Sequence, residues 1–557
     1  MTAKHLVIGL DGADVDVIEG LGPEQLPAIF GLMQRGAWAR LESVKPPATL
    51  PNWTTFLTGV DPGRHGVFDF TSRRGYGVAF TAGTIREAPT VAARLDRLGK
   101  RCALVGFPAT WPPEQLEHGV FMSGWDSPVA FEADRSFVWP RSLHDEMTSR
   151  FGPSRFDDVD EFDAERPGWH ARLPAQLVER VARKTELARW LLERDDWDLF
   201  AFYFGESDTA AHHLWAFHDP SSPRHRAGHE DALAQVYRAL DAAVAALVDA
   251  AGDDVEITLV SDHGSGGASD RVLYLNRALA EAGLLRFRPR SWTGPLVGRA
   301  KDLALTALPG RARQALFSAA GRALPGWVES RARFGAIDFP RTRAFSDELN
   351  YFPAVWLNLR GRDPDGTVDP RDVEHVRRDV QDALQALRDP WSGAPVVREV
   401  VPREALYDGP HVERAPDLIV ELELSPGGSY NVMPSASAPP GTGPWRKLAP
   451  EEHLGRKGRS LPGSHRERGL YVAAGPRVRA AGEIRARMPD ATATLLARMG
   501  VTPAPEMSGR VLREALARRA SSVALPDAAP PASAALRHAR GDRTALERRL
   551  RALGYID

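Results

Sequence analysis

Short apolar segments recur along the chain, and most of them are followed by a longer stretch with helical spacing. Their apolar character is continuous instead of alternating, which is typical of strands that are buried on both faces. We expect strands at residues 6–10, 37–44, 102–107, 199–204, 255–260, 418–422 and 470–473. Helical stretches lie between them, for example at residues 176–194 and 232–251. This alternation predicts an α/β fold with a mostly parallel sheet and helices on both faces.

Two irregular stretches interrupt this pattern and suggest insertions into one large domain over residues 1–520. The first, at about residues 126–170, is acidic, and the second, at about residues 285–345, is rich in Arg, Pro and Trp. We expect them to form cap segments above the sheet, the second as a lid or as peripheral packing. Residues 521–537 have the Pro- and Ala-rich composition of a linker, and residues 538–557 are expected to form a helical tail.

Acid, histidine and hydroxyl side chains follow the predicted strands. Ligands of such sheets bind at the carboxyl ends of the strands, so these side chains are expected to meet there. Asp208 and His212 are four residues apart, which places them on one face of a helix. Each cluster alone has an ordinary explanation as a turn, a helix cap or a surface histidine, but five of them at one edge predict a functional site. The set is Asp11, Thr49, Asp208, His212, Asp262, His263 and His465.

Three aspartates, three histidines and one hydroxyl form a donor set suited to two divalent cations. Nitrogen and oxygen ligands favour Zn²⁺, and Mn²⁺ is also accepted by such ligands. Pro51 suits the first turn of a helix, which places Thr49 beside backbone N–H groups that can bind an oxyanion. Two cations about 4 Å apart can stabilise an in-line displacement at phosphorus.

Charge and cysteine content exclude several other functions. The 557 residues include 71 basic and 73 acidic side chains, and a net charge of −2 does not favour a nucleic-acid polymer or an anionic membrane as a partner. The single cysteine, Cys102, excludes a disulfide framework and a cysteine-based zinc cluster. No apolar run is long enough to span a membrane, and the N-terminus lacks a signal-peptide pattern, so we expect a cytoplasmic protein that binds a small molecule. No pattern indicates the oligomeric state.

The order of these motifs resembles the alkaline phosphatase superfamily, and within it the type I phosphodiesterase/nucleotide pyrophosphatase family. The motifs are Asp-Gly, Thr-x-Pro-Asn, Asp-x-x-x-His, Ser-Asp-His-Gly and Gly-x-His, and residues 54–69 look like the segment that follows the family's nucleophile. The resemblance covers roughly residues 4–275 and 340–515. It implies an alkaline-phosphatase-like fold, with one metal held by Asp208, His212 and His465, and a second held by Asp11, Asp262 and His263 together with the Thr49 hydroxyl.

The resemblance also implies a chemistry: Thr49 attacks phosphorus and forms a phospho-threonine intermediate. Asn52 matches the position that donates a hydrogen bond to a non-bridging phosphate oxygen, and the Leu50 N–H is a second candidate donor. Trp53 stands where eukaryotic members carry histidine, and we expect its indole to serve in helix packing.

Alternative functions remain open at this point. A phosphomonoesterase could use the same core, although Asn52 in place of an arginine favours diesters. A catalytically inactive metal-binding scaffold is the alternative from another class, which the complete ligand set disfavours. A sulfatase requires Cys or Ser in the context C/S-x-P-x-R, and a phosphoglycerate mutase of this superfamily uses Ser, whereas this chain has Thr49-Leu50-Pro51-Asn52.

Overall fold

A nine-stranded sheet forms the centre of the computed structural model, which describes residues 4–80, 85–124, 135–152, 164, 167–289, 333–348, 352–455, 460–517 and 523–526. The strand order is β19-β2-β18-β9-β1-β8-β5-β6-β7. The strands are β1 (His5–Leu10), β2 (Ala37–Glu42), β5 (Cys102–Val105), β6 (Val120–Met122), β7 (Val138–Trp139), β8 (Leu199–Phe204), β9 (Glu256–Val260), β18 (Arg468–Ala474) and β19 (Gly482–Glu483).

The five central strands, from β9 to β6, are parallel, and β18 runs antiparallel to both of its neighbours. The sheet is therefore mostly parallel, as predicted. The strands expected at residues 6–10, 37–44, 102–107, 199–204, 255–260 and 470–473 are all present in it, with ends shifted by up to two residues.

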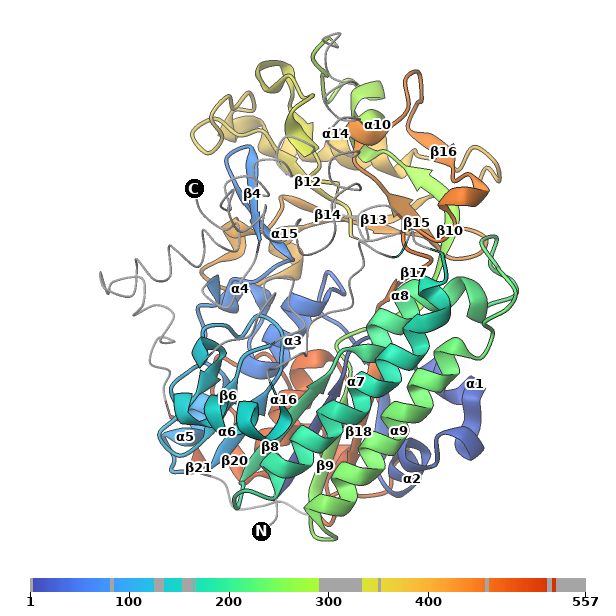
Figure 1. The fold of residues 1–557 in the computed structure, drawn as a ribbon. Helices are drawn as coiled ribbons and strands as arrows, with labels where there is room; N and C mark the ends of the chain where they lie inside the picture. The colour runs from blue at the N-terminus through green and yellow to red at the C-terminus, as the bar shows by residue number, and fades with distance from the viewer. Residues whose placement is uncertain are drawn as a thin grey trace.

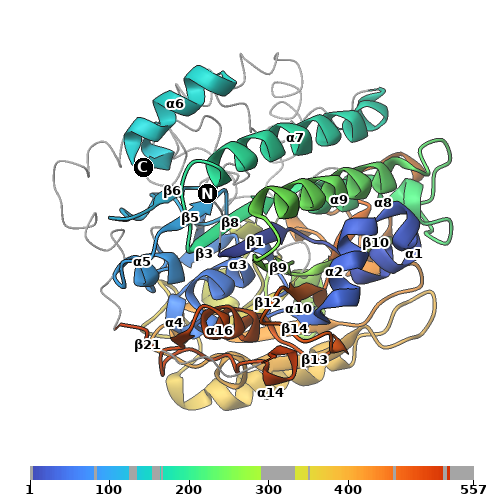
Figure 2. The ribbon, with the colours of Figure 1, turned by 90° about the horizontal axis from the view of Figure 1, so that it is seen from below.

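Helices cover both faces of this sheet, which Figure 2 shows as three layers. One face carries α1 (Val15–Gln25), α2 (Pro27–Arg35), α7 (Trp169–Leu192), α8 (Glu206–His218) and α9 (Ala232–Ala251), and the other carries α3 (Thr49–Thr58), α5 (Val91–Asp96) and α16 (Met488–Arg498). Successive residues of β1 point to opposite faces, so Leu6 and Ile8 pack with the first set and Val7 with the second. This double burial explains the continuous apolar runs.

A second sheet stands beyond the carboxyl ends of the central strands (Figure 1). Its order is β11-β12-β14-β13, and all pairings are antiparallel. The strands are β11 (Ala344–Phe345), β12 (Ala354–Leu357), β13 (Val397–Pro402) and β14 (Leu418–Leu422), and α10 (Leu275–Glu281) and α14 (Val373–Gln385) share their apolar core. The strand predicted at residues 418–422 is thus β14 of this sheet and not part of the mostly parallel sheet. A short apolar run indicates a buried strand but does not identify its partners.

A long strand, β10 (Gly264–Leu273), connects the two parts and pairs with β15 (Ser429–Val432), β16 (Trp445–Lys447) and β17 (Gly463–Arg466). The smaller elements are α4 (Pro62–His65), β3 (Thr71–Arg74), β4 (Gly77–Phe80), α6 (Arg141–Phe151), α15 (Arg403–Leu406), β20 (Val501–Thr502) and β21 (Val523–Ala524).

The predicted insertions are described in part. Within 126–170, the described residues form β7, α6 and the start of α7. Within 285–345, Leu285, Phe334 and Phe345 join the core of the second sheet, and the lid expected between them falls on residues 290–332, outside the described residues. Of the predicted linker only residues 523–526 are described, and the predicted tail at 538–557 also lies outside the description.

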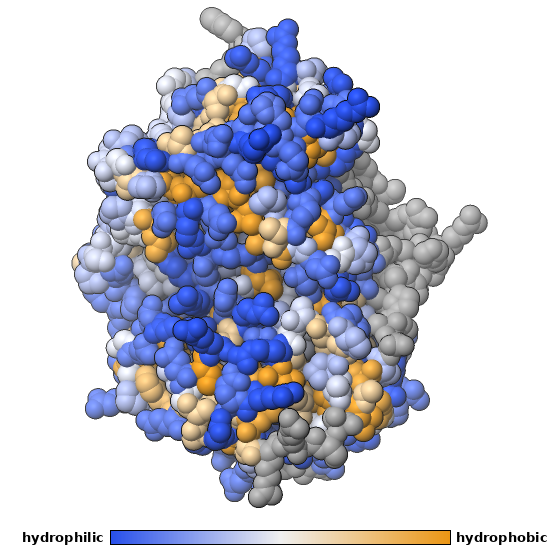
Figure 3. All heavy atoms as spheres, turned by 180° about the vertical axis from the view of Figure 1, so that it is seen from behind, coloured by the Kyte–Doolittle hydropathy of each residue, from blue (hydrophilic) through white to orange (hydrophobic). Residues whose placement is uncertain are grey.

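Among the residues that the structure describes, no helix combines the length and apolar character needed to cross a bilayer. On the face opposite to that of Figure 1, hydrophilic residues predominate and apolar ones lie in small groups among them (Figure 3).

Candidate active site

The predicted site residues come from elements that meet at one edge of the central sheet. Asp11 follows β1, Asp262 and His263 follow β9, and Asp208 and His212 lie on α8, which follows β8. Because β9, β1 and β8 are neighbouring parallel strands, their carboxyl ends bring these side chains together.

His465 reaches the same edge from a different element than expected. The segment Gly463-Ser464-His465-Arg466 precedes the strand predicted at residues 470–473 and is typical of a Gly-rich loop, but His465 lies on β17, where it pairs with Ser265 of β10. Gly463 allows this strand to approach α8, since a Cβ there would stand 2.0 Å from the carbonyl oxygen of Ala211. The glycine therefore has a packing role that sets His465 beside His212.

Asp208, His212 and His465 form the first of two acid–histidine groups. Asp208 Oδ1 lies 3.3 Å from His212 Nε2 and 3.6 Å from His465 Nε2, and the two Nε2 atoms are 2.9 Å apart. The three donor atoms converge within the spacing that a single metal ion requires.

Asp11, Asp262 and His263 form the second group. His263 Nε2 lies 3.2 Å from Asp262 Oδ2, 3.6 Å from Asp11 Oδ1 and 3.4 Å from Thr49 Oγ1. The rings of His263 and His465 stack with their centroids 3.7 Å apart. The two groups are therefore adjacent, and the Thr49 hydroxyl lies beside the second.

Backbone carbonyls orient all three imidazoles. The Nδ1 atoms of His212, His263 and His465 lie 3.1, 3.0 and 3.0 Å from the carbonyl oxygens of Gly463, Gly264 and Pro47. A carbonyl oxygen only accepts, so each Nδ1 carries the proton and each Nε2 presents its lone pair to the carboxylates. This is the arrangement in which histidine binds a metal, and the donor set therefore fits two cations.

Burial makes the second group electrostatically costly without a cation. Asp262 and His263 are fully buried and Asp11 is 1% exposed. Burial, followed by the charge of Asp11, raises the pKa of Asp262 well above its usual value, and burial lowers the pKa of His263 to about 4. Imidazole is thus held neutral, and positive charge must come from elsewhere to stabilise the paired carboxylates.

The helix α3 presents Thr49 as its first residue. Ala48 is the N-cap and provides no side-chain acceptor, so the first-turn N–H groups, including that of Leu50, are not capped by a side chain. A helix N-terminus of this kind is suited to bind an anion next to the hydroxyl.

Asn52 is buried in this structure, where it holds the loop that precedes Thr49. Its Nδ2 donates to the carbonyl oxygens of Pro46 and Ala48 at 3.1 and 2.9 Å, and its Oδ1 accepts from the Val44 N–H at 2.7 Å. A hydrogen bond from Asn52 Nδ2 to a phosphate oxygen would replace one of these bonds. The role of Asn52 in phosphate binding remains a prediction.

Three serines that the sequence analysis did not single out hold the ligand-bearing turns. The hydroxyls of Ser43, Ser207 and Ser265 donate to the carbonyl oxygens of Asp262, Asp11 and Gly12 at 2.7, 2.5 and 2.7 Å. Isolated serines carry no sequence signal for such a role, since their partners are backbone atoms of distant segments.

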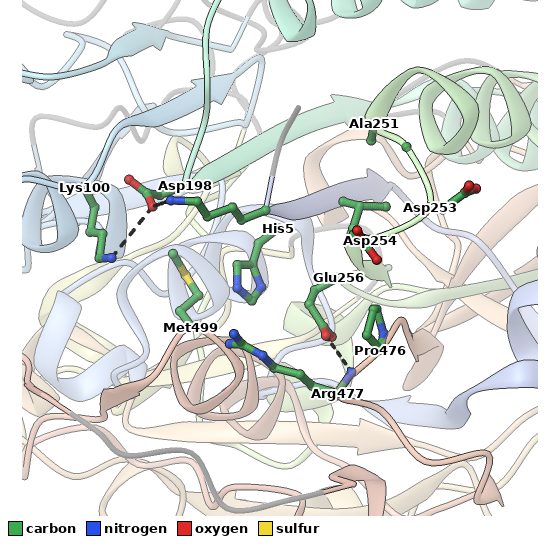
Figure 4. Close-up of a pocket in the computed structure, with 13 residues that line it drawn as sticks. His5, Lys100, Asp198, Ala251, Asp253, Asp254, Glu256, Pro476, Arg477 and Met499 are labelled. Carbon is green, nitrogen blue, oxygen red and sulfur yellow. Dashed lines mark hydrogen bonds and ion pairs between the residues drawn. The ribbon is translucent and has the colours of Figure 1, made fainter. Parts of the chain in front are cut away.

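A cavity of about 490 Å³ lies at the opposite, amino end of the strands (Figure 4). Its lining includes His5, Lys100 and Arg477 and none of the residues of the two acid–histidine groups. It is therefore distinct from the candidate site.

Comparison with known proteins identifies the family and agrees with the fold. The model of the type I phosphodiesterase/nucleotide pyrophosphatase family matches residues 5–427, and the chain belongs to this family. No curated protein sequence matches the chain. Phosphonoacetate hydrolase from Sinorhizobium meliloti 1021, solved with phosphonoformate, superposes with a TM-score of 0.52 at 15% identity, over 89% of this chain and 96% of that one. Murine ectonucleotide pyrophosphatase/phosphodiesterase 5 gives 0.48 at 15% identity, over 92% and 100%.

Family membership makes the chain a hydrolase of phosphoric esters, of the phosphodiesterase/nucleotide pyrophosphatase type. The family is metal-dependent, and two groups of candidate ligands are present at the edge of the sheet where the sequence placed them.

Proposed function

We propose that the protein hydrolyses small phosphoric diesters or pyrophosphates at a site with two divalent cations, through a phospho-threonine intermediate on Thr49. One observation carries the proposal: the Thr49 hydroxyl lies at the start of α3, 3.4 Å from His263 Nε2, where the two acid–histidine groups adjoin. A nucleophile, an oxyanion site and two ligand sets are thereby close together.

In this proposal Asp208, His212 and His465 hold one cation, and Asp11, Asp262 and His263 hold the other. Zn²⁺ is the favoured ion because half of the ligands are imidazoles, and Mn²⁺ is the alternative. When bound, such cations lower the pKa of a coordinated hydroxyl and neutralise charge on the phosphoryl group and leaving oxygen.

The chain's own groups supply positioning. Thr49 is 9% exposed and is the first residue of α3, so its hydroxyl can approach phosphorus in line. The uncapped N–H groups of this turn, Leu50 among them, can donate to the non-bridging oxygens, whose charge grows in the transition state.

The substrate class is tested by parallel rates on bis-p-nitrophenyl phosphate and p-nitrophenyl phosphate with the purified protein and measured metal content. The proposal predicts faster hydrolysis of the diester and loss of both activities after chelation. A faster monoester reaction would instead identify a phosphomonoesterase, and no turnover of any ester with both metals bound would identify an inactive scaffold.

A further inference from the structure

Asp11 receives two hydrogen bonds on the same carboxylate oxygen. The Trp53 Nε1–H donates to Asp11 Oδ2 at 2.9 Å, and the Tyr203 hydroxyl donates to the same atom at 2.6 Å. All three side chains are buried, with exposures of 1% for Asp11, 0% for Trp53 and 3% for Tyr203. They come from the end of β1, from α3 and from β8, which are distant in sequence.

The other oxygen of Asp11 faces the candidate metal site. Oδ1 lies 3.6 Å from His263 Nε2, within the group that Asp262 completes. Two donors on Oδ2 prevent the carboxylate from rotating and engage the lone pairs of that oxygen. Asp11 is therefore prepared to offer Oδ1 as a single-oxygen ligand.

Trp53 also ties Asp11 to the nucleophile. Thr49 and Trp53 are four residues apart on α3, so they lie on one face of the helix. The indole packs edge-on against the rings of Phe107 and Tyr203, with centroids 5.2 and 5.5 Å away. Gly9 leaves room for it, since a Cβ there would lie 2.9 Å from Trp53 Cη2. The position of α3 along β1 is thus fixed by the same side chain that bonds Asp11.

We propose that Trp53 and Tyr203 are positioning residues, which hold Asp11 as a one-oxygen metal ligand, and that Trp53 in addition holds Thr49 in register with it. This inference rests on the proposed function. The sequence predicted a role for Trp53 in helix packing. The hydrogen bond to Asp11 adds a second role, because packing alone does not require the indole N–H to meet a carboxylate.

The test uses Trp53→Phe, which removes the indole N–H and keeps an aromatic ring, and Tyr203→Phe, which removes one hydroxyl. Zn²⁺ is titrated into the metal-free full-length protein against a competing chelator, so that two binding steps are resolved. We expect each variant to weaken one step by about 10- to 100-fold, as loss of a hydrogen-bond partner of a metal ligand does, and to leave the other step unchanged. The unchanged step belongs to Asp208, His212 and His465.

Matched controls remove the same atoms elsewhere. Trp197 is 2% exposed and donates its Nε1–H to the Leu191 carbonyl, and Tyr471 is fully buried. Trp197→Phe and Tyr471→Phe should leave both binding steps within about twofold of wild type, a margin well below the 10-fold effect expected at Asp11. A change of both steps in all four variants would show a general loss of stability and overturn the proposal, as would unchanged steps in Trp53→Phe and Tyr203→Phe.

Turnover at saturating metal separates the two roles. Once Zn²⁺ occupies both steps, Tyr203→Phe should recover the wild-type kcat, whereas Trp53→Phe should keep a lower kcat with an unchanged KM. Equal recovery of both variants would refute the register role of Trp53. If the wild-type protein binds no Zn²⁺, the proposed function fails. If it binds two ions and Trp53→Phe and Tyr203→Phe bind them with wild-type affinity, this inference alone fails.

Discussion

His212 Nε2 and His465 Nε2 lie 2.9 Å apart, although each ring directs its Nδ1 to a backbone carbonyl oxygen. Two imidazole lone pairs at this distance repel one another unless a positive charge lies beside both. Asp208 Oδ1, within 3.6 Å of each nitrogen, adds a negative charge to the same place. The arrangement is favourable for a cation and unfavourable without one.

We therefore expect two divalent ions per chain in protein purified without chelator. His465→Ala and Asp262→Asn should each lower the content by about one ion, because each removes a ligand from a different group of three. Elemental analysis after dialysis measures this. His375→Ala is the control, since that side chain is 67% exposed on α14, away from the site, and it should retain two ions. Unchanged content in both ligand variants would contradict the assignment.

Chelation should also lower thermal stability. An ion that binds only the folded state stabilises it by about 2.7 kcal/mol at a free concentration 100 times its Kd. The buried carboxylates of Asp11 and Asp262 repel each other when the cation leaves. Thermal unfolding with EDTA, and after addition of Zn²⁺ or Mn²⁺, should show a lower Tm that either ion restores, Zn²⁺ more strongly. An identical Tm with and without chelator would contradict this expectation.

Asn52→Ala should lower both stability and kcat. The variant removes the Nδ2 donor to the Pro46 and Ala48 carbonyls and the Oδ1 acceptor of the Val44 N–H, and such losses cost about 1–3 kcal/mol. Asn431→Ala is a matched control, since its Nδ2 donates to two buried carbonyls of β10, those of Ser269 and Arg271. It should lose similar stability, measured by urea unfolding, and keep its kcat. A large loss of kcat/KM in Asn52→Ala with unchanged stability would indicate a substrate contact instead.

His65 predicts a specific pH dependence of stability. It is fully buried, its Nδ1 accepts the Val67 N–H at 3.1 Å, and burial followed by the charge of Arg86 lowers its pKa to about 3. Between pH 6.5 and 3 the unfolded chain therefore binds a proton that the folded chain does not. The free energy of unfolding should therefore decrease as the pH is lowered through this window, by up to about 1.4 kcal/mol per pH unit for this group.

His65→Asn removes this proton and retains an acceptor for the Val67 N–H. In metal-free protein, urea unfolding between pH 6 and 4 should give a flatter dependence for the variant than for wild type, whatever their difference at pH 7. Parallel curves for the two proteins would contradict the origin of the slope in His65.

Local sequence patterns were sufficient for the elements that carry the ligands. Asp208 and His212 share a helical turn, and Asp11 and Asp262 follow strands whose apolar runs are continuous. Residues that follow parallel strands lie at one edge of the sheet, and this placement can be predicted without knowing the side-chain contacts. The central sheet and the convergence of the ligands could therefore be predicted.

Other features depend on contacts between distant segments and gave no local signal. Residues 418–422 were recognised as a strand, but their pairing with β12 and β13 in an antiparallel sheet was not. In the sequence Tyr203 is one more residue of the apolar run that forms β8. Its hydroxyl donates to Asp11, which is 192 positions away in the sequence. Trp53 likewise acts through a partner, Asp11, that only the folded chain brings near.

The most direct test of the account is the rate of diester hydrolysis by Thr49→Ala with both metals shown to be bound. Removal of the nucleophile should reduce kcat by roughly 10³-fold or more while the Tm and metal content stay close to wild type. Hydrolysis at the wild-type rate by that metal-loaded variant would show that Thr49 does not attack phosphorus.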